Sequence, residues 1–118
     1  MRITVPISVG ELLDKISILE IKSTFTDNEY VHKELKELNE IKDTITQFTL
    51  EYMNELREVN HNLWKIEDEL RKLEKDKNFG ERFIELARSV YIINDKRSEI
   101  KKKINELCGS EFKEVKVY

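Results

Sequence analysis

The chain has 118 residues, of which 38% are charged and 39% hydrophobic, and 21 basic against 24 acidic side chains give a net charge of −3. This length predicts one domain, the single cysteine excludes a disulfide framework or a multi-cysteine metal site, and the lack of a basic excess argues against nucleic acid as a partner. No apolar run approaches the roughly 20 residues that span a bilayer, and the first residues lack the apolar stretch of a signal peptide. We therefore expect a soluble, cytoplasmic, helix-rich protein with no membrane partner.

The two ends of the chain have the same pattern, in which apolar and polar residues alternate. Three β-branched apolar residues alternate near the N-terminus and two valines near the C-terminus. Period two with β-branched residues is typical of strands. We expect strands over 2–7 and 112–118, and we expect them to pair as a two-stranded ribbon because neither strand is stable alone.

The first half of the chain predicts two helices. Ser8-Val9-Gly10-Glu11 fits a capping box, which predicts a helix over about 9–24. Asp27 or Asn28 can cap a second helix over about 28–47, whose apolar residues recur at helical spacing.

β-Branched threonines gather at the end of this second helix and predict a turn near 47–51. The alternative is one continuous helix over 28–77. The sequence leaves both open.

The second half of the chain predicts a long antiparallel hairpin of helices over about 51–77 and 80–108. Each helix carries an apolar ladder with alternating spacings of four and three residues, and Asp76–Gly80 between them is a turn in which Gly80 is free to adopt a positive φ. One register satisfies both ladders, as an antiparallel coiled coil requires. The pairs that it brings together are Leu73–Phe83, Leu70–Leu86, Ile66–Val90, Leu63–Ile93, Leu56–Ile100 and Tyr52–Ile104. The predicted fold is an all-α antiparallel helical bundle dominated by this hairpin, with the terminal ribbon added.

The same register gives the hairpin two different flanks. One flank is charged and predicts a solvated edge of paired charges; it carries Glu55, Asn62 and Glu69 opposite Arg82, Ser89, Lys96 and Lys103. The other flank has small, aromatic and amide side chains, which suit contact with the first two helices or with a second subunit. It carries Asn60, Trp64, Glu67, Ile84, Ala87, Tyr91 and Asn94.

Arg97 interrupts the apolar ladder of the last helix. A buried arginine needs a partner because an unpaired buried charge is very costly. We expect this partner to be a carboxylate, and the candidates are Glu11, Asp14, Glu20 and Glu67. Either the pair is structural and fixes the packing register, or Arg97 binds an anion or carboxylate ligand.

A ligand pocket is the second hypothesis for the same region. Convergent polar groups beside an aromatic ring are typical of ligand sites, whereas a hydrogen-bond network that joins helices would use the same residues. The candidate ligand-binding residues are Asn60, Trp64, Glu67, Tyr91, Asn94 and Arg97.

Other polar groups do not predict chemistry. Glu67-Asp68-Glu69 are consecutive and point in three directions, as a solvated face does. His61 is level with Asp95 but has no nucleophile near it, and Cys108 ends a helix, where a thiolate is not favoured. We expect no catalytic residue, metal or cofactor.

Several segments together make a recognisable pattern. They are Val5–Ser8 leading into Gly10–Ile16, Asn62–Asp68, Phe79–Gly80 leading into Phe83–Tyr91, Asn94–Arg97, Ile104–Glu106 and Gly109–Ser110. The pattern resembles a family of short bacterial and phage proteins of unknown function, most weakly over 25–55. The resemblance implies that the hairpin and its flank from Asn60 to Arg97 define the family, and it implies no activity.

Two functions follow as expectations. The first is a non-enzymatic, oligomeric helical adaptor, most simply a dimer, that binds a protein partner through its bundle surface. The alternative is a binding protein for an anionic or nucleotide-like molecule, or an all-α enzyme, that uses the pocket residues named above.

Overall fold

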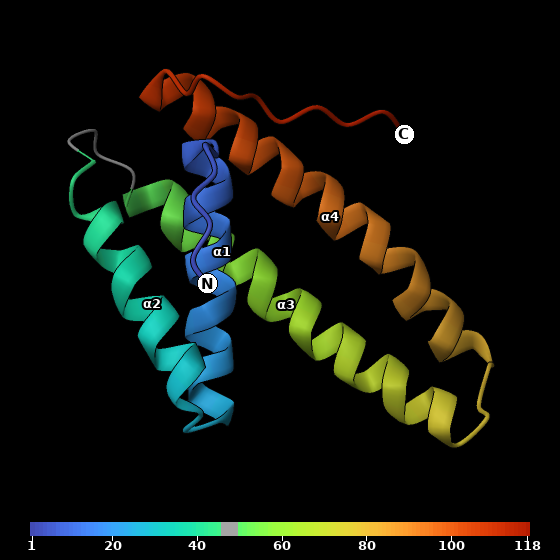
Figure 1. Cartoon of the computed structure of the whole chain (residues 1–118). Helices are drawn as coiled ribbons and strands as arrows, with labels where there is room; N and C mark the ends of the chain where they lie inside the picture. Colours follow the sequence, from blue (N-terminus) through green and yellow to red (C-terminus); the bar gives the residue numbers. More distant parts are fainter. Residues whose placement is uncertain (46–49) are drawn as a thin grey trace.

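The fold is all-α, as expected from the sequence. The computed structural model describes residues 1–45 and 50–118, and in this part of the chain it has four helices (Figure 1). They are α1 (Val9–Phe25), α2 (Glu29–Lys42), α3 (Leu50–Lys75) and α4 (Glu81–Cys108). Within these described segments, no helix is both long enough and apolar enough to cross a membrane.

The helix starts follow the expected capping residues. Ser8 Oγ accepts a hydrogen bond of 3.1 Å from the Glu11 amide at the start of α1, whereas the Glu11 carboxylate binds Lys101. Of the two candidate caps for α2, Asn28 is the one used, because its side chain accepts from the Tyr30 amide at 2.9 Å. Capping side chains of this kind satisfy amides that have no partner within the helix.

α2 is shorter than the periodicity predicted. It ends at Lys42, and the Thr44 hydroxyl then donates to the Ile41 carbonyl at 2.6 Å, a local bond that competes with helix continuation. Residues 43–45 are outside any helix, so the single helix over 28–77 is wrong. The turn expected near 47–51 falls mainly on 46–49, which lie outside the described residues.

The hairpin turn between α3 and α4 takes its positive φ at a different residue from the one expected. Lys77 has φ 56°, whereas Gly80 has φ −75°. The Lys77 amide donates to the Glu74 carbonyl at 3.1 Å and the Asn78 amide to the Leu73 carbonyl at 2.9 Å. This pair of bonds ends a helix through one left-handed residue just past its C-cap, and that residue here is Lys77.

The core forms where α1 packs against the open end of the α3–α4 hairpin. α1 contacts α2, α3 and α4, and α3 contacts α4 (Figure 1). The buried core residues are Leu12, Leu13, Ile16, Met53, Leu56, Ile100 and Ile104. Leu56 and Ile100, expected to meet across the hairpin, are therefore together in a core that α1 also enters. On the charged flank, Arg82 Nε donates to Glu69 at 2.8 Å, which confirms one of the expected charge pairs.

The two-stranded ribbon predicted for the termini is wrong. Residues 1–7 and 111–118 are described and are not strands. The start of α1 meets the segment after α4 where the Val9 amide donates to Ser110 Oγ at 3.0 Å, and the two terminal segments diverge from there (Figure 1).

Ion pairs hold the two terminal segments on different helices. Arg2 Nη2 binds Glu37 of α2 at 2.8 Å, and Lys116 Nζ binds Asp95 of α4 at 3.3 Å. Because the two segments follow separate helices, they cannot form a ladder with each other.

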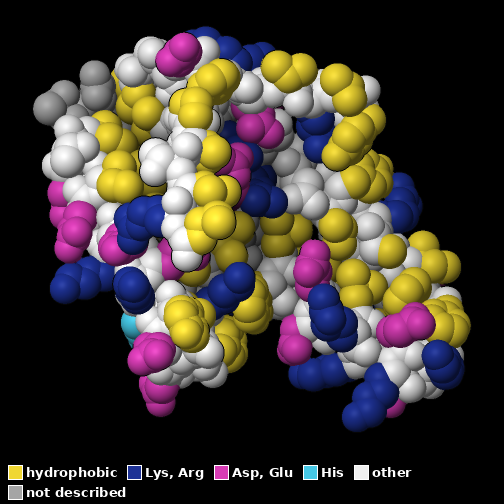
Figure 2. Space-filling view, viewed as in Figure 1, with side chains coloured by type: hydrophobic (Ala, Val, Ile, Leu, Met, Phe, Trp, Pro, Cys, Tyr) yellow, Lys and Arg dark blue, Asp and Glu magenta, His cyan; other side chains and the backbone are white. Residues whose placement is uncertain are grey.

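The molecule is more extended than a compact chain of this length. Its radius of gyration is 16.1 Å, whereas a compact domain of this length has about 13.5 Å. Figure 2 shows the reason, a hollow between the lower ends of α1 and α2 and the tip of the α3–α4 hairpin. The shape is therefore two helical arms joined at the core.

Candidate functional site

Polar side chains from three helices meet beside the core. On α4 they recur at helical spacing, from Asn94 through Arg97 and Lys101 to Asn105, so that they share one face of the helix. α1 and α3 supply the groups that face them. We call the following residues the polar cluster: Glu11, Asp14, Ser17, Asn60, Arg97 and Lys101.

Asp14 is the centre of the polar cluster. Its side chain is 1% exposed, and Arg97 binds it through Nε, at 2.8 Å from Oδ1, and through Nη2 on Oδ2. Of the four carboxylates expected as partners of Arg97, Asp14 is the one found. The hydrogen bonds to Asp14 raise the pKa of Arg97 above its ordinary value, against the opposing effect of burial. A bidentate arginine–carboxylate pair is among the stronger hydrogen-bonded arrangements in proteins.

Asn60 joins α3 to the same carboxylate. Its Nδ2 donates to Asp14 Oδ1 at 2.8 Å and to Ser17 Oγ at 2.6 Å. The Ser17 hydroxyl in turn donates to the Asp14 carbonyl at 2.7 Å. α1, α3 and α4 are therefore connected through one buried carboxylate.

Lys101 lies next to this ion pair and is buried too. Its side chain is 9% exposed, and Nζ lies 2.8 Å from Glu11 Oε2, 3.2 Å from Glu114 Oε2 and 4.0 Å from Asp14 Oδ2. Burial lowers the pKa of Lys101, but the hydrogen bond to Glu11 and the charges of the other carboxylates outweigh it, so the pKa is raised. The ammonium group therefore stays protonated.

The start of α1 approaches the backbone of α4 very closely. The Gly10 amide donates to Asn105 Oδ1 at 2.7 Å, and Asn105 is fully buried. A Cβ on Gly10 would lie 2.7 Å from the Lys101 carbonyl oxygen and 2.9 Å from Asn105 Oδ1. Only glycine, which has no Cβ, allows this approach.

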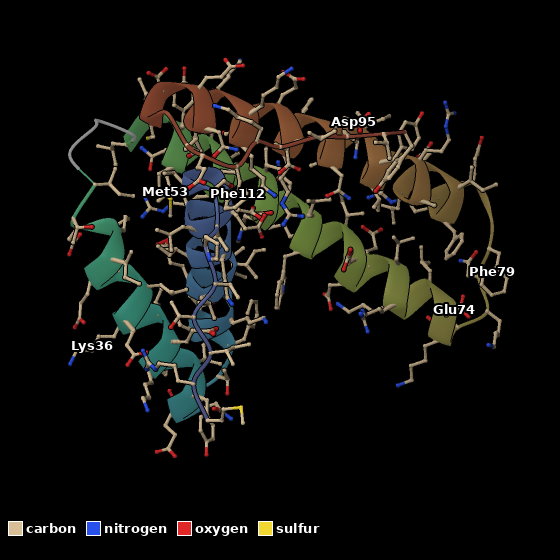
Figure 3. The ribbon with its side chains drawn as sticks, turned by 45° about the horizontal axis from the view of Figure 1, so that its top comes forward. Lys36, Met53, Glu74, Phe79, Asp95 and Phe112 are labelled. Carbon is tan, nitrogen blue, oxygen red and sulfur yellow. The ribbon has the colours of Figure 1, made fainter. Side chains whose placement is uncertain are left out.

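A cavity of about 600 Å³ opens beside the polar cluster, between α4 and the C-terminal segment. Figure 3 shows Asp95 where this segment passes α4. Three cationic side chains reach the cavity, but each is already paired with a carboxylate. The residues that line it include Tyr91, Asn94, Asp95, Arg97, Lys101, Glu114, Lys116 and Tyr118.

Of the six ligand-binding residues expected from the sequence, three line the cavity and three lie outside it. Tyr91, Asn94 and Arg97 line the cavity together, and Arg97 Nη1 donates weakly to Asn94 Oδ1 at 3.4 Å. Asn60 is buried outside the cavity, where its side chain donates a hydrogen bond to Asp14.

The last two expected residues lie elsewhere on α3. Trp64 stacks on Phe25 of α1, with ring centroids 5.4 Å apart, and the exposed Glu67 borders hollows that do not include Arg97. The cavity beside the polar cluster is therefore lined by α4 and the C-terminal segment, without Asn60, Trp64 or Glu67.

Sequence reasoning missed Gly10, Ser17, Lys101 and Asn105. Lys101 is the first of three consecutive lysines, but its spacing of four from Arg97 places it on the same face of α4. That spacing is the signal that could have found Lys101 and Asn105. Nothing in the sequence marks Gly10 as a point of contact with α4.

The polar cluster is suited to holding helices together, because its donors and acceptors bind one another. Among the described residues, no group of three or more histidine, cysteine, aspartate or glutamate side chains is placed to hold a metal ion. Burial raises the pKa of Cys108, which lowers the thiolate fraction of that residue at neutral pH.

Comparison with known proteins gives a family and no activity. Residues 3–118 match the model of DUF6165, which is described as a family of unknown function. No curated protein and no solved structure matches the chain. The match spans the whole polar cluster and the hairpin, and it confirms the resemblance to an uncharacterised family.

Proposed function

We propose that this chain, which belongs to the DUF6165 family, is a helical protein-interaction module that self-associates and has no catalytic activity of its own. The observation that carries the proposal is the large solvent-accessible surface of the chain. The accessible surface is 8618 Å², whereas a compact monomer of 14.1 kDa has about 6,700 Å². The excess of about 1,900 Å² on one chain is more than the roughly 800 Å² that each partner buries in a standard protein–protein interface.

Several large apolar side chains of the hairpin are exposed, which supports an interface. Ile84 and Tyr91 on α4 are 54% and 57% exposed, and Phe79 in the hairpin turn is 50% exposed. Contiguous exposed apolar surface marks interaction sites in folded proteins. The polar cluster supports the same function, because its groups satisfy one another and hold the arms in a fixed arrangement.

Self-association predicts the mass in solution. Sedimentation equilibrium over a wide concentration range is expected to give about 28 kDa, twice the chain mass of 14.1 kDa. Repeating the measurement at high salt is the control, because association through apolar surface persists when surface charges are screened. A mass of 14.1 kDa at every concentration would contradict the proposal.

The cavity beside α4 supports a second candidate, a site for a small anionic molecule. Its volume of about 600 Å³ is in the usual range for ligand sites. Glu114, from the C-terminal segment, already places one carboxylate 3.2 Å from Lys101 Nζ. An external anion would take the position that the Glu114 carboxylate occupies.

Inorganic phosphate is the probe that tests this cavity. Titration followed by amide NMR is expected to give saturable shifts at residues that line the cavity, such as Ser98. Lys101→Met is expected to abolish these shifts, whereas Lys36→Met on the exposed face of α2 leaves them unchanged. Shifts that do not saturate, or that are equal in both variants, would exclude the anion site.

A further inference from the structure

The outer part of the α3–α4 hairpin lacks the third layer that covers its base. α1 ends at Phe25, which stacks on Trp64 with ring centroids 5.4 Å apart. We call the part of the hairpin beyond this point, residues 66–93, the hairpin arm. Leu86 is the buried member of its apolar ladder. The other members are only half-buried, and they are Ile66, Leu70, Leu73, Phe83, Val90 and Ile93.

A groove of about 450 Å³ runs along one face of the hairpin arm. Its apolar lining is Leu70, Phe83, Ala87 and Val90, and its rim is Glu67, Arg71 and Glu74. Glu67 and Arg71 also border a smaller hollow that Trp64 lines. The groove therefore begins close to the place where α1 leaves the hairpin.

We propose that this groove binds the hairpin arm of a second copy, antiparallel to the first and related to it by a two-fold axis. The two hairpins would then form a four-helix bundle, the arrangement in which every helix of the two arms buries its apolar stripe. The inference rests on the self-association proposed above and assigns it a surface. The surface excess of about 1,900 Å² is large enough for such an interface.

Two charged residues on the rim, Glu67 and Arg71, can pair with the same two residues of a second copy. Within the described chain, neither Glu67 nor Arg71 has an ion-pair partner. They lie four residues apart on the same face of α3. A two-fold axis that passes between them reverses their order in the second copy. Glu67 of each copy then faces Arg71 of the other, and both pairs form at once.

A bulky charge placed in the groove is expected to separate the two copies. Ala87 is small and exposed, so Ala87→Arg is expected to leave the helix content unchanged by circular dichroism and to give a monomer of 14.1 kDa by sedimentation. Glu99→Arg, at an exposed position of α4 outside the groove, is the matched control and stays dimeric. A folded Ala87→Arg dimer as tight as the wild type would overturn the assigned surface while leaving self-association intact.

Charge reversal tests the antiparallel arrangement in the same experiment. Glu67→Arg and Arg71→Glu, each alone, are expected to weaken dimerisation by about tenfold or more, because each creates two like-charge contacts. The double variant is expected to restore it, and Glu58→Arg, an exposed change on α3 outside the groove, has no effect. Single variants that weaken the dimer without rescue in the double variant would overturn the two-fold pairing. A monomeric wild type would overturn the proposed function itself.

Discussion

Replacing Asp14 by leucine is expected to lower the free energy of unfolding by about 3–5 kcal/mol, measured by urea denaturation at fixed protein concentration. The reason is the arginine that remains. Arg97 is partly buried and binds Asp14 through two nitrogens, and Asn60 donates to the same carboxylate. Removing one member of a buried pair costs more than the pair contributes, because the other charge is left without a partner.

The partner variant separates this effect from a simple loss of packing. Arg97→Leu alone is expected to lower the free energy of unfolding. The double variant Asp14→Leu/Arg97→Leu is expected to lower it by much less than the sum of the two single changes. Glu34→Leu is the control, because Glu34 forms only an exposed pair with Lys15 at 3.6 Å, and such pairs contribute about 0–1 kcal/mol. Additive effects of the two single changes would show that the ion pair does not link α1 to α4 energetically.

Replacing Gly10 by alanine is expected to lower the free energy of unfolding by about 2–4 kcal/mol. The new Cβ would lie 2.7 Å from the Lys101 carbonyl oxygen and 3.2 Å from Lys101 Cα. Backbone atoms cannot rotate away, so α1 must move off α4. That movement stretches the 2.7 Å hydrogen bond from the Gly10 amide to Asn105.

Gly80→Ala is the matched control for this change. A Cβ on Gly80 would meet only the Asn78 side chain, at 3.3 Å, and the φ of Gly80, −75°, is accessible to alanine. The expected cost is about 0.5–1 kcal/mol, the difference between glycine and alanine at a helix N-cap. Equal melting temperatures for Gly10→Ala and the wild type would contradict the close approach of α1 to α4.

The sequence was most informative where local chemistry decides the structure. Ser8 predicted one helix start, and Asp27 or Asn28 predicted the other, because a capping side chain acts within three residues of itself. The interrupted ladder predicted that Arg97 has a carboxylate partner, and Asp14 was among the four candidates. Spacing cannot choose among such candidates, because the choice depends on how α1 crosses the hairpin.

The failures also have physical causes. The alternation at the two ends is a strand pattern, but strands need partners, and ion pairs to Glu37 and Asp95 hold the ends on separate helices. Gly80 was expected to provide the positive φ, whereas the hydrogen bonds that end α3 place it at Lys77. Trp64 and Glu67 share one flank of the hairpin register with the cavity residues, but the register does not show that α1 covers Trp64 on that flank.

The buried contacts of α1 impose an order on folding during synthesis. Gly10 and Asn105, which share a hydrogen bond, are 95 residues apart, and at about 5–20 residues per second a ribosome needs about 5–20 s to make that stretch. Arg97 is made only in the last part of that time, so the Asp14 carboxylate lacks its arginine partner while α2 and α3, which also pack on α1, are made. The docking of the first helix on the last is therefore a late step of folding, which follows the synthesis of the α2 and α3 surfaces that also pack on α1.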